Sequence, residues 1–86
     1  MEVRSRVGWN LRRLRVAQGI SQDDLGLAAG LERAYIGHLE RGTKNPTILT
    51  LQKLATALGC DVSELLRLVP KGSEGLAPLR AGRRKS

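Results

Sequence analysis

Residue types able to do covalent chemistry are scarce in this 86-residue chain. His38 is the only histidine, and no Cys or Ser lies at a recognisable catalytic spacing from it. The sequence also lacks a metal-ligand cluster, a glycine loop of the phosphate-binding type, and paired carboxylates placed for acid–base work. We therefore expect no enzymatic activity, no metal, no other cofactor and no small-molecule ligand.

The basic side chains indicate a different function, the binding of a polyanion. The formal net charge is +7, which favours nucleic acid as a partner. Residues 1–69 hold 10 basic and 7 acidic side chains, and residues 70–86 hold 5 and 1. More than half of the excess charge therefore lies in the last segment, so net charge alone is weak evidence and the folded part must carry the argument.

The elements that must position these groups are helices. Aliphatic side chains recur every three or four positions, and they must fill the core because the chain contains no Phe. Ser21, Thr47 and Asp61 are residue types that cap helix N-termini, and Gly or Pro follows each apolar segment. We expect five helices, the first ending near Gly19 and the others lying between Ser21 and Gly30, from about Glu32 to Arg41, between Thr47 and Gly59, and between Asp61 and Pro70.

Apolar stripes and a glycine-containing turn define the fold class. The stripe of the fourth helix runs from Ile48 to Leu58, and that of the fifth from Val62 to Val69. Over residues 21–41, a short helix, a turn with glycine and a second short helix form the layout of a helix-turn-helix. The predicted class is all-α, a compact five-helix bundle with a flexible basic C-terminal tail.

The chain length allows one domain, residues 1–69, and residues 70–86 are expected to form a disordered basic tail. A lone Cys60 cannot form an internal disulfide and is typical of a reducing compartment. No apolar run approaches the roughly 18 residues of a membrane span, and residues 1–4 lack the order of a signal peptide. We expect a cytoplasmic protein without membrane association.

Short stretches between residues 7 and 66 follow one another in a characteristic order and spacing. They are NLRRLR (10–15), GISQ (19–22), AGL (29–31), YI (35–36), LERG (39–42), NPT (45–47) and LATALG (54–59). In this pattern the chain resembles the helix-turn-helix family of lambdoid phage repressors and Cro proteins, also called the xenobiotic-response-element (XRE) family. The resemblance implies a lambda-repressor-like domain whose third helix enters the DNA major groove. It further implies a transcription regulator, repressor or activator, that binds a palindromic operator as a homodimer.

The resemblance also assigns roles to individual residues. It implies a partly buried ion pair between Arg15 and Glu40 that fixes the angle of the third helix and contacts no base. Base contacts fall on Arg33, Ala34, Gly37 and His38. Phosphate contacts fall on Gln22, Tyr35, Arg41, Thr43, Lys44 and Asn45. The dimer interface falls on Cys60, Asp61, Val62, Glu64, Leu65 and Leu68.

Each role has an ordinary structural alternative. Arg33 can form a bidentate pair with guanine, worth roughly 1–3 kcal/mol against another base, or it can remain a solvated side chain. His38 can donate a hydrogen bond to a base or a phosphate, or it can remain a solvated side chain on the helix surface. Gly37 stands where the family usually has a small polar residue, and it either lets the helix approach the groove more closely or is a neutral change. Most leucines of the expected dimer surface can equally belong to the core.

Trp9 does not fit the core stripe. It falls opposite Val7 and Leu11 on a helical wheel, with Val16 seven residues further on. An exposed Trp and Val on a basic helix indicate a second surface for a protein partner; packing of Trp9 on a neighbouring Arg is the alternative. This surface favours the rival function, an antitoxin or antiactivator that binds another protein. The basic residues at 80–85 either add phosphate affinity or only increase solubility.

Overall fold

The computed structural model describes residues 1–72, which form four α-helices and one 3-10 helix without any strand. The helices are α1 (Val3–Ala17), α2 (Gln22–Ala29), α3 (Arg33–Glu40) and α4 (Ile48–Leu58), followed by the 3-10 helix η1 (Val62–Leu66). The all-α class is confirmed, whereas the expected fifth α-helix is the 3-10 helix η1. Residues 73–86 of the predicted tail lie outside the described part. Within residues 1–72, no helix combines the length and the apolarity that crossing a membrane requires.

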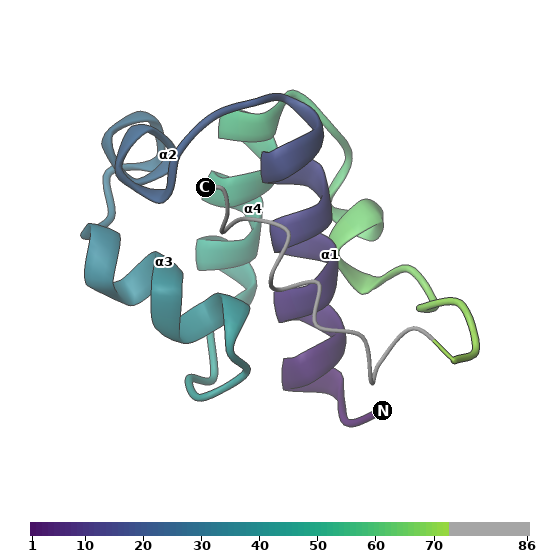
Figure 1. The fold of residues 1–86 in the computed structure, drawn as a ribbon. Coiled ribbons are helices and arrows are strands. Elements are labelled where there is room, and N and C mark those ends of the chain that lie inside the picture. The colour runs from purple at the N-terminus through teal and green to yellow at the C-terminus, as the bar shows by residue number, and fades with distance from the viewer. Residues whose placement is uncertain (73–86) are drawn as a thin grey trace.

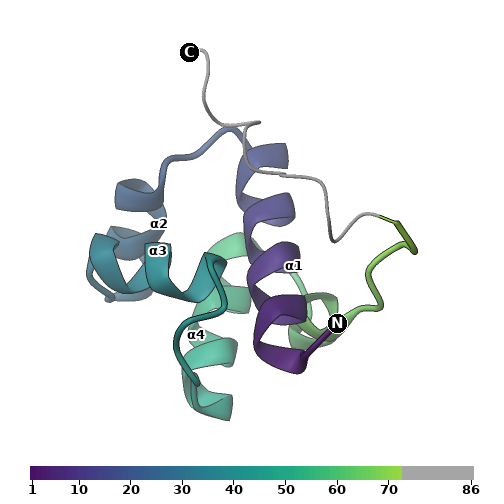
Figure 2. The same cartoon turned by 60° about the horizontal axis from the view of Figure 1, so that its bottom comes forward.

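The helix-turn-helix formed by α2 and α3 occupies one side of the molecule. Helix α1 packs against both α3 and η1, and the two views place α3 and η1 on opposite sides of it (Figures 1 and 2). Helix α2 packs against α3 and α4, while η1 completes the other side by packing against α1 and α4. The outer face of α3 and the surface around η1 therefore point away from each other.

An aliphatic core joins all five elements. Each element contributes at least one side chain with at most 1% of its surface exposed, and burial of such a side chain stabilises the fold by roughly 1.5–3 kcal/mol. Ile48 departs from the expected stripe because it is 79% exposed. It is the first residue of α4, where the apolar pattern extends past the end of the core. The fully buried apolar residues are Leu11, Leu25, Ile36, Leu39, Leu54 and Leu65.

Local signals set the helix ends. The Ser21 hydroxyl accepts the N–H of Asp24 at 2.9 Å, and the Thr47 hydroxyl accepts the N–H of Thr50 at 3.0 Å. Gly30 ends α2 with φ +73°, a left-handed conformation that favours glycine. These predicted caps are confirmed, and Gly30 begins the short turn between α2 and α3.

Side chains of α1 explain why η1 is a short 3-10 helix. The buried Asn10 amide donates to the carbonyls of Leu65 at 3.2 Å and Arg67 at 2.8 Å, and Arg6 donates to the carbonyl of Leu66 at 3.3 Å. In a longer α-helix these carbonyls would accept backbone N–H groups from the following turn. Here α1 supplies the donors, so the backbone becomes extended at Arg67, with ψ 145°.

Candidate nucleic-acid interface

Helix α3 divides into a buried face and an outer face. Ile36 and Leu39 anchor it in the core with 0% and 1% exposure. Arg33 and Ala34 are exposed in its first turn, and His38 follows one turn later, half-buried. Residues 33, 34, 37 and 38 share one side of a helix because its period is 3.6 residues. The structure thus brings the four predicted base-contacting positions together on the outer face of α3.

Arg15 and Glu40 form a bidentate ion pair between α1 and the last residue of α3. Arg15 Nε lies 2.6 Å from Glu40 Oε2, and Arg15 Nη2 lies 3.1 Å from Glu40 Oε1. Arg15 also donates to the carbonyl of Ile20 at 2.9 Å. The side chains are 11% and 3% exposed, so water screens the pair poorly. This pair holds the C-terminal end of α3 against α1.

Glu40 has two further neighbours that the sequence did not reveal. Gln22 Nε2 donates to Glu40 Oε1 at 3.0 Å, and Arg12 Nη1 lies 3.8 Å from the same oxygen. Burial lowers the pKa of Arg12, and the Glu40 carboxylate opposes that shift. Arg12, Arg15, Gln22 and Glu40, here called the Glu40 cluster, therefore connect α1, α2 and α3. The spacing of Arg12 and Arg15, three residues apart on one helix face, was the available signal.

Gly37 is buried because the side chains of two neighbouring residues cover it. A Cβ at this position would lie 3.3 Å from Arg41 Nη1 and 3.7 Å from Gln22 Oε1. Gln22, predicted to contact a phosphate, thus lies against α3 and is bonded to Glu40. Arg41, also predicted to contact a phosphate, lies over the same face of α3.

The loop between α3 and α4 presents the remaining predicted phosphate contacts. Thr43 has a structural role in the loop, because its hydroxyl and its backbone N–H donate to the carbonyl of His38 at 3.1 and 3.0 Å. Lys44 and Asn45 are exposed, and no ion pair within residues 1–72 includes Lys44. Tyr35 is partly buried with its ring against the core. Lys44 and Asn45 are therefore the loop side chains placed to meet an anion.

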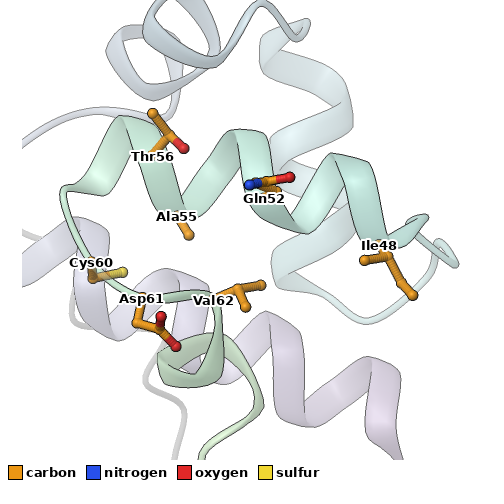
Figure 3. Close-up of a pocket in the computed structure, with 7 residues that line it drawn as sticks. All are labelled: Ile48, Gln52, Ala55, Thr56, Cys60, Asp61 and Val62. Carbon is orange, nitrogen blue, oxygen red and sulfur yellow. The ribbon is translucent and has the colours of Figure 1, made fainter.

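A hollow of about 320 Å³ lies between α4 and the segment that leads into η1 (Figure 3). It contains three predicted dimer residues, Cys60, Asp61 and Val62, together with Ile48, which the sequence placed in the core. Leu68 is 75% exposed, whereas Leu65 has no exposed surface and packs in the core. Leu65 lies on the apolar stripe predicted for residues 62–69 and Leu68 lies off it, so the exposure of both residues agrees with their spacing.

Cys60 and Trp9 are the remaining side chains that the sequence singled out. Burial, Glu64 and Asp61 raise the pKa of the Cys60 thiol, so at neutral pH it is a poor nucleophile. Residues 1–72 contain no group of three His, Cys, Asp or Glu side chains that could hold a metal ion. Trp9 is half-buried rather than exposed, and its Nε1 is buried without a hydrogen-bond partner among these residues. It therefore does not form the exposed aromatic patch that the sequence suggested.

The comparisons with known proteins agree with this geometry. The helix-turn-helix (HTH_3) family model matches residues 11–65. The HTH-type transcriptional regulator y4dJ of Sinorhizobium fredii is 42% identical over 66 residues, which cover 77% of this chain and 86% of that protein. The restriction-modification controller protein C.AhdI from Aeromonas hydrophila is similar in structure with a TM-score of 0.71 and 44% identity, over 72% of this chain and 94% of that one. The controller protein C.Esp1396I, solved as a tetramer in complex with its natural 35-base-pair operator, has a TM-score of 0.67 and 27% identity, over 78% of this chain and 99% of that one.

Proposed function

We infer that this chain is a sequence-specific regulator that binds operator DNA as a homodimer, because it belongs to the helix-turn-helix (HTH_3) family of DNA-binding transcription regulators. The observation that carries this proposal is the placement of α3. Its inner face is anchored by Ile36 and Leu39, and its outer face presents Arg33 and Ala34 to solvent. A helix exposed in this way can enter the major groove of B-DNA.

Polar groups on both sides of α3 support the proposal. Gln22 lies at the start of α2, where N–H groups and a side-chain amide can meet a phosphate. To do so, the amide must exchange or share its bond to Glu40, since its Nε2 lies 3.0 Å from Glu40 Oε1. Lys44, in the loop after α3, is exposed and meets the backbone on the other side. These contacts fix the register of α3 without selecting a sequence.

The salt dependence of binding tests this function. A fragment from the DNA that flanks the protein's own gene is titrated at several salt concentrations, followed by fluorescence anisotropy. Because each phosphate contact releases counterions, the wild type is expected to show a steep negative slope of log K against log[salt]. Lys44→Ala is expected to reduce the slope by about 1 and to weaken all sequences equally.

Lys53→Ala is the matched control, because Lys53 is exposed on α4 beside a different hollow. It removes the same charge from the protein and is expected to leave the slope close to that of the wild type. A flat wild-type salt profile argues against DNA binding. Equal losses for Lys44→Ala and Lys53→Ala would mean that the protein binds DNA through diffuse charge rather than through the proposed face.

We propose that the second copy of the chain packs on the hollow beside η1. The support is the exposure of two large apolar side chains: Ile48, which lines the hollow, is 79% exposed, and Leu68, two residues after η1, is 75% exposed. The tetrameric state of C.Esp1396I on its operator adds to it. To occupy successive major grooves, the two α3 helices of such a dimer must lie roughly 34 Å apart. Leu65 is left out of this surface because it is fully buried in the core.

Ile48→Glu is expected to yield a monomer at concentrations where the wild type is a dimer, because each interface would bury two uncompensated carboxylates. Leu49→Glu is the control: Leu49 is 68% exposed but lines the other hollow, with Ala28 and Lys53. Analytical ultracentrifugation measures both states. If Leu49→Glu dissociates the protein and Ile48→Glu does not, the interface lies on the α2–α4 side instead.

A further inference from the structure

The side chain of Arg41 turns back along α3 instead of extending toward the loop. Arg41 caps α3, and its Nη2 lies 3.3 Å from Nδ1 of His38, three residues earlier. Its Nη1 lies 3.3 Å from the point where a Cβ of Gly37, four residues earlier, would be. Side chains at a helix end lean toward the preceding turn, which places this guanidinium beside positions 37 and 38 of the outer face.

Gly37 provides the space that the guanidinium occupies. A Cβ there would make a contact of 3.3 Å with Arg41 Nη1, tighter than ordinary van der Waals contact, so the arginine would have to move. Helix interiors disfavour glycine by about 1 kcal/mol relative to alanine. The glycine is therefore accounted for by the position of Arg41, which is a different explanation from closer approach of the whole helix to DNA.

His38 fixes the orientation of this guanidinium. Arg41 Nη2 lies within hydrogen-bond distance of His38 Nδ1, so the imidazole ring lies against the guanidinium. The Thr43 hydroxyl, 3.0 Å from the same Nδ1, holds the ring from the loop side. No ion pair within residues 1–72 includes Arg41. Most of its five N–H donors are thus available on the face that carries Arg33.

We propose that Arg41 contacts a base, not a phosphate, and specifies a guanine in each half-site; this rests on the proposed function. An arginine that lies in the major groove can bind O6 and N7 of guanine with two parallel hydrogen bonds. The guanidinium lies beside Gly37, one helical turn from Arg33, which corresponds to about 6 Å along the axis. The two arginines therefore contact different base pairs.

The test is selection of DNA from a random library, followed by affinity measurements on the selected site. The proteins are the wild type, Arg41→Ala, Arg41→Lys and, as a phosphate control, Lys44→Ala. Arg41→Ala is expected to bind the selected site about 5- to 150-fold more weakly and to lose the preference for guanine at one position of each half-site. Arg41→Lys keeps the charge but not the bidentate geometry, so it is expected to lose the same preference. Lys44→Ala is expected to weaken binding without changing the preferred sequence.

The outcomes separate the two proposals. If Arg41→Ala weakens all sequences equally and Arg41→Lys restores binding, Arg41 contacts a phosphate and this inference is wrong, while the proposed function stands. If the wild type enriches no sequence, the proposed function and this inference both fail.

A double-mutant cycle then tests the link to Gly37. Gly37→Ala is expected to reduce the preference at the Arg41 position in the same direction but by less, and to add nothing in the Arg41→Ala background. Equal effects in both backgrounds would show that Gly37 acts independently of Arg41, which contradicts the assigned role of the glycine.

Discussion

Replacing Glu40 by Gln is expected to lower the free energy of unfolding by about 3–5 kcal/mol, the usual cost of breaking a buried ion pair. The Glu40 side chain is 3% exposed, and it accepts two hydrogen bonds from Arg15 and one from Gln22. Glutamine keeps the shape but removes the charge that balances Arg15 and the nearby Arg12. It also turns an N–H group toward a guanidinium that cannot accept it. Urea unfolding followed by circular dichroism measures the change.

Glu2→Gln is the matched control, since it removes the same charge from a different glutamate–arginine pair. Glu2 and Arg4 lie 2.9 Å apart but are 51% and 48% exposed. Exposed pairs contribute about 0–1 kcal/mol, and the amide oxygen of Gln can still accept the N–H of Arg4 that Glu2 caps. A loss of less than about 1 kcal/mol for Glu40→Gln, similar to that for Glu2→Gln, would show that the Glu40 cluster does not hold α3 in place.

The features that the sequence predicted are those governed by near neighbours. Ser21 and Thr47 cap helices by bonding N–H groups three residues away, so their role is visible in a short stretch of sequence. The length of η1, by contrast, depends on Asn10, whose amide binds the carbonyl of Leu65, 55 residues away. The same holds for Gln22 and Glu40, which are 18 residues apart. Such partners cannot be found without the arrangement of the helices.

Apolar spacing also has a limit that this chain illustrates twice. Ile48 continues the stripe of α4 by spacing, yet it is 79% exposed because the core ends before it. Leu65 and Leu66 both belong to the stripe predicted for residues 62–69, and Leu65 is fully buried while Leu66 is 39% exposed. Periodicity identifies the face of a helix but not how far along that face the core extends. The candidate dimer surface therefore needed the structure, whereas the candidate groove-facing positions 33, 34, 37 and 38 did not.

The position of α3 depends on contacts from three neighbouring segments rather than on the helix itself. Helix α3 spans only Arg33–Glu40, and a helix this short is marginal in isolation. The Glu40 cluster holds its end through α1 and α2. At its start, Gly26 allows the turn to pass close to α2, where a Cβ would lie 2.5 Å from the carbonyl oxygen of Leu31. The orientation of the outer face, and with it the proposed DNA contact, follows from these approaches.

Helix α1 also passes close to the end of α3 at Gly8, and this approach predicts a large effect for Gly8→Ala. A Cβ at position 8 of α1 would clash with the carbonyl oxygen of Leu39 and would lie 2.7 Å from that of Glu40. Both atoms belong to the backbone, so relief requires α1 and α3 to separate. We expect a loss of about 1–3 kcal/mol in the free energy of unfolding, the usual cost of overpacking. We also expect a loss of DNA affinity in protein that is still folded, because α3 turns relative to α2 and the proposed phosphate-binding groups.

Gly37→Ala makes the same chemical change in the interior of α3, but we expect it to change the free energy of unfolding in the opposite direction. Its nearest neighbours would be the ends of the flexible Arg41 and Gln22 side chains, at 3.3 Å or more, which can move. Alanine is favoured over glycine in a helix interior by about 1 kcal/mol, so this variant should be as stable as the wild type or more stable. Gly8→Ala and Gly37→Ala are compared by urea unfolding and by binding to the selected site. If Gly8→Ala is also neutral or stabilising, the close approach of α1 at Gly8 does not fix the position of α3, and the orientation of α3 must depend on the Glu40 cluster and the turn alone.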